Sequence, residues 1–280
     1  MVDTNTTSTT VAHRRSTRRF YPAAAELLSV MRRWQQWGTL AWADTKFRYR
    51  RTTLGPMWIT VSLAATIFSV GILYGTIFGG DLSQYLPYFA VGMIVWTYLS
   101  SSITEGCLIF IQASSLITSI PVPLVLNVYR MLAGALIVLA HNAVLIGFVW
   151  LIFPWPIGWV TLLAIPALAL DTLALLGIIL TCAIVCTRFR DLHQIVSNVL
   201  QLLFFLTPIM WLPSSLRGEQ LKFFIHLNPF YYLIEVVRSP VLGIAPDITV
   251  WIVVALIALA MLAMGTSFYV HFRHRVAFWL

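Results

Sequence analysis

Long apolar runs alternate with short polar segments along most of the chain. Six of these runs reach the roughly 20 residues that an α-helix needs to cross about 30 Å of hydrocarbon. The pattern therefore predicts an all-α integral membrane protein with six transmembrane helices in a domain over residues 57–280. The expected spans are residues 57–79, 85–104, 127–153, 159–186, 193–212 and 248–270.

Four segments outside these spans have other patterns. Residues 1–30 predict a polar, Arg-rich cytoplasmic tail. Residues 31–56 mix aromatic residues with Arg, which predicts an amphipathic helix in the membrane interface, although a plain basic flank of the first span fits as well. Residues 105–126 contain two prolines and a polar cluster, which favours an inner-face loop or short helix. Residues 213–247 are too apolar for a free loop, so we expect re-entrant outer helices between spans five and six.

Composition and charge support a membrane protein and define its orientation. Apolar residues make up 59% of the 280 residues and charged residues only 10%, against about 25% charged in soluble domains. This excludes a soluble domain, a disordered chain and a nucleic-acid-binding module. Fifteen of the 18 Lys and Arg residues fall on one side of the predicted topology. The positive-inside rule then places both termini in the cytoplasm.

The chain lacks the usual motifs of membrane enzymes. It has no P-loop, no His-Glu-x-x-His and no Asp cluster that would hold Mg²⁺. Its three cysteines, Cys107, Cys182 and Cys186, lie in apolar runs and are expected to be packing residues rather than metal ligands. We therefore expect no catalytic residues and no metal site.

Two polar residues inside the predicted spans are candidates for function, because intramembrane polar groups are expensive. A rise of 1.5 Å per residue places Asp171 about 25 Å, and His141 about 16 Å, above the inner face. Asp171 is either structural, capped by hydroxyls or facing a watery cavity, or part of a transport pathway. A direct pair with His141 requires the two helices to be offset.

Three stretches together resemble one family. The first runs from Asp44 through Phe47-Arg48-Tyr49-Arg50-Arg51 and Gly55-Pro56 to Trp58. The second is Arg188-Phe189-Arg190-Asp191-Leu192, followed by an apolar run that ends in Leu206-Thr207-Pro208-Ile209-Met210-Trp211. The third is Leu227-Asn228-Pro229-Phe230, with Arg238 downstream. Their order and spacing resemble the membrane subunits of type 2 ABC exporters over about residues 35–275. The greatest similarity is to the polysaccharide branch, which exports O-antigen, teichoic acid or cell-wall galactan.

The resemblance implies a permease subunit that moves a polyprenyl-diphosphate-linked polysaccharide across the cytoplasmic membrane of a bacterium. Two copies of this chain would work with two copies of a separate ATP-binding subunit, which would hold the ATP and Mg²⁺. This chain itself would bind no cofactor and no nucleic acid. One alternative is a type 2 exporter of a smaller lipid, drug or antibiotic. Another is a stand-alone channel or secondary transporter.

The resemblance also implies three groups of site residues. Loops that couple to the ATPase map to Ser114, Ser115, Leu116, Ile117, Pro121, Pro123, Arg188, Arg190 and Asp191. Many relatives have a basic residue where this chain has Thr118 and Ser119, and Asp191 also fits a helix cap. Contacts with lipid head groups map to Trp34, Trp37, Arg48, Tyr49, Arg50 and Arg51. Pore or gate positions, for which apolar anchoring is the alternative, are Phe68, Tyr74, Phe204, Phe205, Phe230, Tyr231 and Tyr232.

Overall fold

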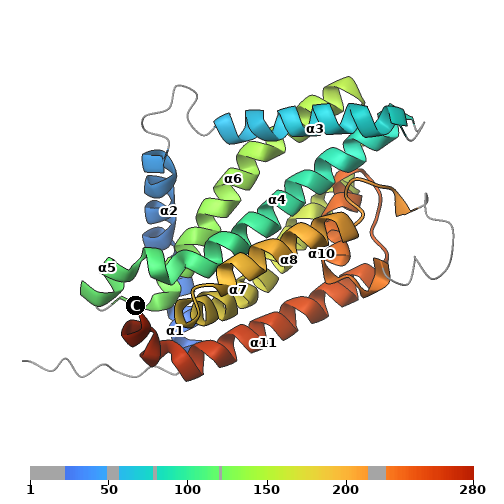
Figure 1. The fold of residues 1–280 in the computed structure, drawn as a ribbon. Coiled ribbons are helices and arrows are strands. Elements are labelled where there is room, and N and C mark those ends of the chain that lie inside the picture. The colour runs from blue at the N-terminus through green and yellow to red at the C-terminus, as the bar shows by residue number, and fades with distance from the viewer. Residues whose placement is uncertain (1–22, 49–56, 78–80, 120–121, 214–224) are drawn as a thin grey trace, which may run out of the picture.

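The structure is a computed structural model, and it describes residues 23–48, 57–77, 81–119, 122–213 and 225–280. Five helices among these residues are long and apolar enough to cross a membrane (Figure 1). They are α3 (Met57–Ile77), α4 (Leu82–Gln112), α6 (Leu124–Ile152), α7 (Ala164–Arg188), which follows the short 3-10 helix η1 (Trp159–Leu163), and α11 (Ile248–Trp279). Helices therefore form at the predicted spans one, two, three, four and six, and α4 and α11 continue well beyond them.

The predicted fifth span is shorter than expected. Helix α8 (Leu192–Leu206) has 15 residues, which is about 22 Å at 1.5 Å per residue and less than the hydrocarbon thickness. It ends because Thr207 has an extended backbone, with φ −89° and ψ 136°. The next residue is Pro208, and a proline disfavours helical geometry in the residue before it. A continuous helix over 193–212 is therefore wrong, and the count of six spans stays a prediction.

The interfacial helix predicted over 31–56 is helical over residues 34–48, and residues 49–56 lie outside the described residues. Two helices, α1 (Ala23–Arg32) and α2 (Trp34–Arg48), lie across one end of the bundle (Figure 1). Helix α1 is the amphipathic one. In α2 the buried residues are the small Ala41 and Thr45, which allow close packing on α6, whereas Trp34, Trp42 and Phe47 are at least 60% exposed. Aromatic residues on several sides of α2 replace the single apolar stripe that the sequence suggested.

The expected loop over 105–126 is mostly helical. Helix α4 continues to Gln112 because Cys107 and Phe110 are completely buried and extend its packing face. The short helix α5 (Ser114–Ser119) follows, and its polar residues are exposed or half-buried. A short helix was one of the two forms expected here.

Helix α10 (Pro229–Val241) lies at the opposite end of the bundle from α5, packed against α4, α7 and α11 (Figure 1). It begins at Asn228, whose side chain accepts a hydrogen bond from the Phe230 N–H at 2.9 Å. Proline at the first helical position suits this start, because the N–H that it lacks would have no partner there. Part of the 213–247 segment is thus helical, and its re-entry into the membrane stays a prediction.

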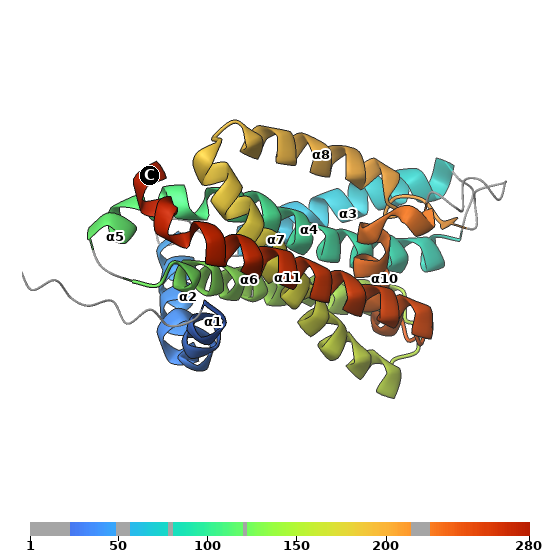
Figure 2. The ribbon, with the colours of Figure 1, turned by 90° about the horizontal axis from the view of Figure 1, so that it is seen from below.

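Among the described helices, α7 and α11 share the most extensive contact, and they cross in the view of Figure 2. A Cβ atom added at Gly177 would lie 2.2 Å from the backbone of Met261, and one added at Gly265 would lie 2.3 Å from the Gly177 carbonyl oxygen. Only hydrogen side chains fit between these backbones. Small residues at helix contacts are typical of membrane proteins, in which packing rather than water exclusion drives association.

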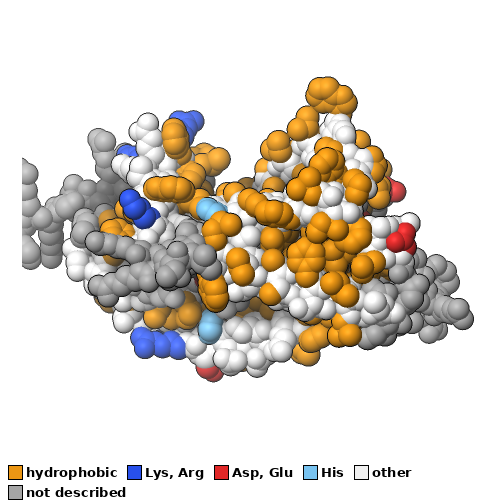
Figure 3. Space-filling view, turned by 90° about the horizontal axis from the view of Figure 1, so that it is seen from above, with side chains coloured by type: hydrophobic (Ala, Val, Ile, Leu, Met, Phe, Trp, Pro, Cys, Tyr) orange, Lys and Arg blue, Asp and Glu red, His pale blue; other side chains and the backbone are white. Residues whose placement is uncertain are grey.

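The two ends of the bundle differ in charge. The end that carries α1, α2 and α5 is called the basic end here, because it holds Arg32, Arg33, Lys46, Arg130, Arg188, Arg190, Arg273 and Arg275. The other end, called the α10 end, has one described cation, the buried Arg238. Figure 3 shows Lys and Arg toward one end of a face that is otherwise largely apolar. This distribution agrees with the predicted orientation, in which the basic end is cytoplasmic.

Candidate functional site

A groove between α4 and α8 is the strongest candidate for a transport surface. It encloses about 540 Å³ and is open along one side. Its polar lining residues are Thr97, Ser100, Thr104, Ser197 and Gln201, and its apolar lining residues are Met93, Trp96, Leu200, Phe204 and Phe205. A polar stripe in the middle of two apolar helices is costly unless it faces a watery space.

The hydroxyl groups of the groove are arranged to accept hydrogen bonds. Thr97 donates to the Met93 carbonyl oxygen at 2.7 Å, Thr104 to the Ser100 carbonyl oxygen at 2.9 Å, and Ser197 to the His193 carbonyl oxygen at 3.0 Å. Each hydroxyl proton is thus used within its own helix, which leaves oxygen lone pairs for other donors. Groups that carry many hydroxyl donors are therefore suited to this surface.

Aromatic rings close the groove toward the α10 end. The Trp96 ring centroid lies 5.7 Å from Phe204 and 5.5 Å from Phe230, so that rings from α4, α8 and α10 meet. Phe205 contacts Phe204 at 5.3 Å between ring centroids. The predicted pore residues Phe204, Phe205 and Phe230 therefore lie together. Trp96 was missed at this site, although its i, i+4, i+8 spacing with Ser100 and Thr104 places all three on one helix face.

The other predicted pore residues lie elsewhere. Phe68 and Tyr74 pack half-buried against the core from α3 and do not line the groove. Tyr231 and Tyr232 form a cluster with His226 at the start of α10, with 5.2 Å between the two tyrosine ring centroids. Burial, followed by the nearby Glu235 carboxylate, raises the pKa of the Tyr231 phenol.

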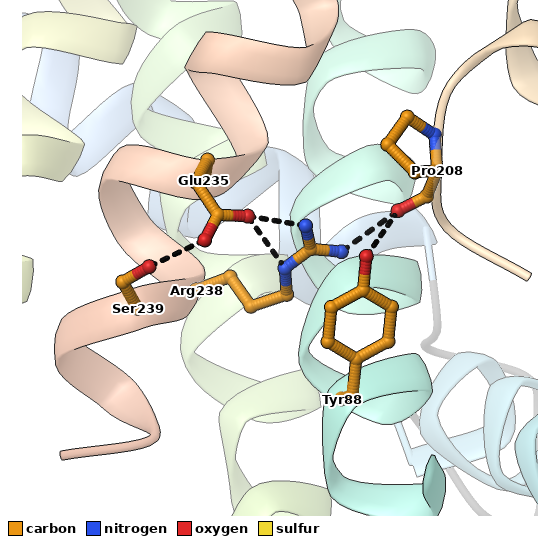
Figure 4. A network of polar contacts seen from close by, with 5 residues as sticks. All are labelled: Tyr88, Pro208, Glu235, Arg238 and Ser239. Atoms are coloured by element: carbon orange, nitrogen blue, oxygen red, sulfur yellow. Dashed lines mark hydrogen bonds and ion pairs between the residues drawn. The ribbon is translucent and has the colours of Figure 1, made fainter. Parts of the chain in front are cut away.

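A buried ionic network holds the turn that ends α8 (Figure 4). Arg238 on α10 is 1% exposed and forms an ion pair with Glu235. Its Nη1 donates to the Pro208 carbonyl oxygen at 2.8 Å, and the Tyr88 hydroxyl donates to the same oxygen at 2.9 Å. The guanidinium also lies 3.8 Å from the centre of the Tyr88 ring. One buried cation thus joins α4, α10 and the end of α8.

Further hydrogen bonds complete this arrangement. The Asn228 amide donates to the Thr207 hydroxyl at 2.8 Å, and the Tyr85 hydroxyl donates to the Met210 carbonyl oxygen at 2.5 Å. The backbone beyond the helix break would otherwise lack partners, and α4 and α10 supply them. The motifs Thr207-Pro208, Asn228-Pro229-Phe230 and Arg238, which are separate in the sequence, form one structural unit.

The predicted coupling residues lie at the basic end. Ser114, Ser115, Leu116 and Ile117 form α5, and Pro123 precedes α6, whereas Pro121 lies outside the described residues. Arg188 is the last residue of α7, and Arg190 and Asp191 lie between α7 and α8; all three are exposed. Arg188 lies 5.7 Å from the centre of the Trp279 ring. Asp191 precedes α8, but its backbone is helical and its side chain makes no capping bond, so the capping interpretation is wrong.

The predicted interfacial residues divide between the surface and the core. Trp34 is 63% exposed. Trp37 instead stacks on Tyr129 of α6 at 5.9 Å and donates to the Val30 carbonyl oxygen at 3.2 Å, which anchors α2 to the bundle. Arg48 is the last residue of α2, and Tyr49, Arg50 and Arg51 lie outside the described residues.

The two intramembrane polar residues, Asp171 and His141, form no hydrogen bond with each other. Asp171 is 0% exposed, and neither carboxyl oxygen has a hydrogen-bond partner among the described residues. The expectation of capping by hydroxyls is therefore wrong, because the adjacent Thr172 bonds to Tyr98 at 2.8 Å instead. His141 bonds through Nδ1 to the Ile137 carbonyl oxygen at 2.7 Å within its own helix.

Comparison with known proteins shows the family of this chain. The family model described as ABC-2 type transporter matches residues 35–242. An O-antigen export system permease protein RfbA of Myxococcus xanthus is 25% identical over 197 residues, which cover 70% of this chain and 75% of that protein. Two proteins of the same name from Klebsiella pneumoniae are each 24% identical over 194 residues, covering 68% of this chain and 74% of theirs. Because the family model spans most of the chain, including the groove and the Arg238 network, this protein belongs to the ABC-2 type transporters.

Proposed function

We propose that this chain is the permease subunit of an ABC exporter that carries a polyprenyl-diphosphate-linked polysaccharide outward across the bacterial cytoplasmic membrane. The observation that carries the proposal is the α4–α8 groove, in which hydroxyl oxygens that accept hydrogen bonds lie beside aromatic rings. The names of the relatives, which are O-antigen export permeases, support the same substrate class.

The side chains that line the groove are suited to a glycan that moves along it during export. Each sugar residue offers hydroxyl donors to Thr97, Thr104 and Ser197, and an apolar ring face to Trp96 and Phe204. Such contacts are weak and repeated, so that a glycan is guided without being trapped. Conduction needs binding that is favourable enough for entry and weak enough for exit.

One chain provides only part of a channel, because its groove is open along one side. A second copy would complete the wall, as the predicted homodimer requires. The Trp96, Phe204 and Phe230 rings would then form the gate near the outer face. In the six-span arrangement, α8 and the turn held by Arg238 together cross the membrane.

The energy would come from two copies of a separate ATP-binding subunit, which would hold the ATP and Mg²⁺. They would bind at the basic end, where α5 and residues 188–191 are accessible. Closure of the ATPase pair would move α5 and the α7–α8 connection and so widen the groove. In this arrangement both termini are cytoplasmic.

Affinity purification of the chain from its own membrane in mild detergent tests the proposal. We expect a stoichiometric P-loop ATPase and lipid-linked sugar in the same eluate, identified by mass spectrometry. An ATPase together with a small lipid or drug would contradict the polysaccharide assignment. An intact dimer without any ATPase partner would overturn the exporter assignment as a whole.

Variants of the groove test its role directly. Ser100→Leu combined with Gln201→Leu removes polar groups from facing walls, and we expect export to fall at least several-fold while the ATPase still co-purifies. Thr66→Leu is the matched control, because this exposed hydroxyl on α3 bonds to its own helix and does not line the groove. Equal export by both variants would exclude the groove as the substrate path.

A further inference from the structure

The last three turns of α11, residues 269–279, extend beyond the length that a membrane span needs. The helix has 32 residues, which is about 48 Å at 1.5 Å per residue, whereas the hydrocarbon is about 30 Å thick. Because α11 begins directly after its capping residue Asp247, the turns from Tyr269 onward lie past the hydrocarbon, at the basic end. The family model matches residues 35–242 and assigns nothing to these turns.

One side of these turns is packed firmly against the bundle. Tyr269 and Val276 are 1% and 0% exposed. The Tyr269 hydroxyl donates to Glu26 Oε1 on α1 at 3.1 Å, and Arg273 forms an ion pair with the same carboxylate. The other side of these turns therefore presents side chains in a fixed arrangement.

Ring and cation contacts join the end of α11 to the predicted coupling residues. The Arg188 guanidinium lies 5.7 Å from the centre of the Trp279 ring and 5.8 Å from the centre of the Phe189 ring. Phe272 lies 5.9 Å from Trp279 between ring centroids, and the Arg275 guanidinium lies 6.0 Å from the centre of the Phe272 ring. Helix α11 also contacts α5, and its end lies beside α5 in Figures 1 and 2. The end of α11 and the predicted coupling segments thus form one continuous surface.

The exposed side chains of this surface are arginines and aromatic rings. Phe278 is 88% and Phe189 55% exposed, and Arg188, Arg190 and Arg275 are exposed as well. These five residues are called the basic aromatic surface here. An exposed ring that lies past the hydrocarbon faces water rather than lipid, so its burial by a partner is favourable. Arginine and aromatic residues are also the side chains that most often anchor protein interfaces.

The sign of the charge defines the chemistry of the partner. The three arginines are accompanied by the exposed carboxylate of Asp191, so these four residues are net positive. The complementary partner is a protein surface with acidic side chains around an apolar pocket that takes the Phe278 ring. Anionic lipid head groups match the charge but offer no apolar pocket beyond the hydrocarbon.

From these observations we infer that the basic aromatic surface is part of the docking site for the ATP-binding subunit. Phe278 is its apolar anchor, and Arg275 attracts the acidic face of that subunit. The inference rests on the proposed function, which supplies the ATPase. It extends the contact from α5 and residues 188–191 to the end of α11.

Photo-cross-linking in the native membrane tests the location of the contact. With p-benzoylphenylalanine at position 278, we expect a light-dependent adduct with a P-loop protein, identified by mass spectrometry. Position 159 is the matched control, because Trp159 is also 88% exposed but lies in η1, which packs against α10 at the opposite end of the bundle. The same photoreactive residue there should give no such adduct.

Binding measurements separate the two roles. The purified ATPase subunit is titrated onto the full-length chain in phosphatidylcholine nanodiscs, which carry no net lipid charge. Phe278→Ala should weaken binding at least about tenfold, as expected for an anchor residue, whereas Trp159→Ala should leave it unchanged. Arg275→Glu should slow association and reduce its dependence on salt, and Arg275→Lys should retain both.

The outcomes distinguish this inference from the proposed function. If no ATPase associates with the unaltered chain, the proposed function fails and this inference fails with it. If the ATPase binds the unaltered chain and Phe278→Ala equally well, only the inference is overturned. Adducts from position 278 with lipid alone, or with a second copy of this chain alone, would also overturn it, because the surface would then face the bilayer or a contact between permease subunits.

Discussion

Arg238 on α10 donates a hydrogen bond to the carbonyl oxygen of Pro208, which lies just beyond the end of α8, at 2.8 Å. The proline ends the helix, and the arginine supplies a partner for backbone that the ended helix cannot satisfy. Because α8 forms one wall of the candidate transport groove, this contact sets where that wall stops.

Arg238→Met should destabilise the protein by about 3 kcal/mol or more, because it leaves the Glu235 carboxylate without its buried partner. The double variant with Glu235→Gln should lose less than the sum of the two single losses, since the pair is removed together. Thermal unfolding in detergent measures both effects. A stability of Arg238→Met equal to that of the unaltered protein would contradict a structural role for the network.

Gly177→Ala should strongly reduce the yield of folded protein. The added methyl group would lie 2.2 Å from the backbone of Met261, so α7 and α11 must separate. Overpacking of this kind costs about 1–3 kcal/mol, and a contact with backbone leaves no side chain that can move away. Gly147→Ala is the control and should be harmless, because that position is open. Fluorescence-detected size exclusion would compare the two yields.

Trp96→Ala should weaken the closed end of the groove. It removes ring contacts with Phe204 and Phe230 and truncates a side chain that is 7% exposed, which costs about 3–5 kcal/mol for a buried tryptophan. We expect proteoliposomes with this variant to leak small solutes, whereas Trp96→Phe should remain tight because it keeps an aromatic ring. Identical leakage by the two variants would argue against a gate at these rings.

The start of α11 should show a specific acid dependence. Asp247 accepts from the Thr249 N–H at 2.8 Å, and this bond lowers the pKa of its carboxyl below the ordinary 3.8. Because the pKa of Asp247 is lower in the folded than in the unfolded state, the stabilisation that the capping bond gives to α11 is complete above about pH 3.8. It is lost as the pH falls through the lower pKa of the folded state. The protection of the first-turn amides of α11 from hydrogen exchange, measured relative to their intrinsic exchange rates, should therefore fall on acidification below that pH.

Asp247→Asn separates this acid effect from general acid unfolding. Asparagine keeps the capping oxygen but does not titrate, so the protection of the same amides, relative to their intrinsic exchange rates, should become nearly independent of pH in that window. Asp247→Ala should lose the cap at every pH. If the unaltered protein and Asp247→Asn respond identically to acid, the cap is not the titrating group.

The sequence by itself determined the fold class, the position of five long helices and the charge difference between the two ends. These features follow from chain-local physics. A run of about 20 apolar residues must become a helix in lipid because its backbone needs internal hydrogen bonds. Lys and Arg outside such runs then select one side of the membrane. The family motifs could also be recognised in the sequence, since Thr207-Pro208, Asn228-Pro229 and Arg238 are short patterns in a given order.

Tertiary structure decided where each helix stops and which side chains meet. Helix α4 passes its predicted end because Phe110 finds a buried contact, and α8 stops early because α4 and α10 supply partners for the backbone after Thr207. Trp96 is a groove residue because its ring contacts Phe204 of α8 and Phe230 of α10, and the sequence does not show these contacts. The burial of the Asn127 amide, which has no hydrogen-bond partner among the described residues, likewise follows from tertiary packing. Such contacts join residues far apart in the chain, and no periodicity along one helix encodes which distant residue will satisfy them.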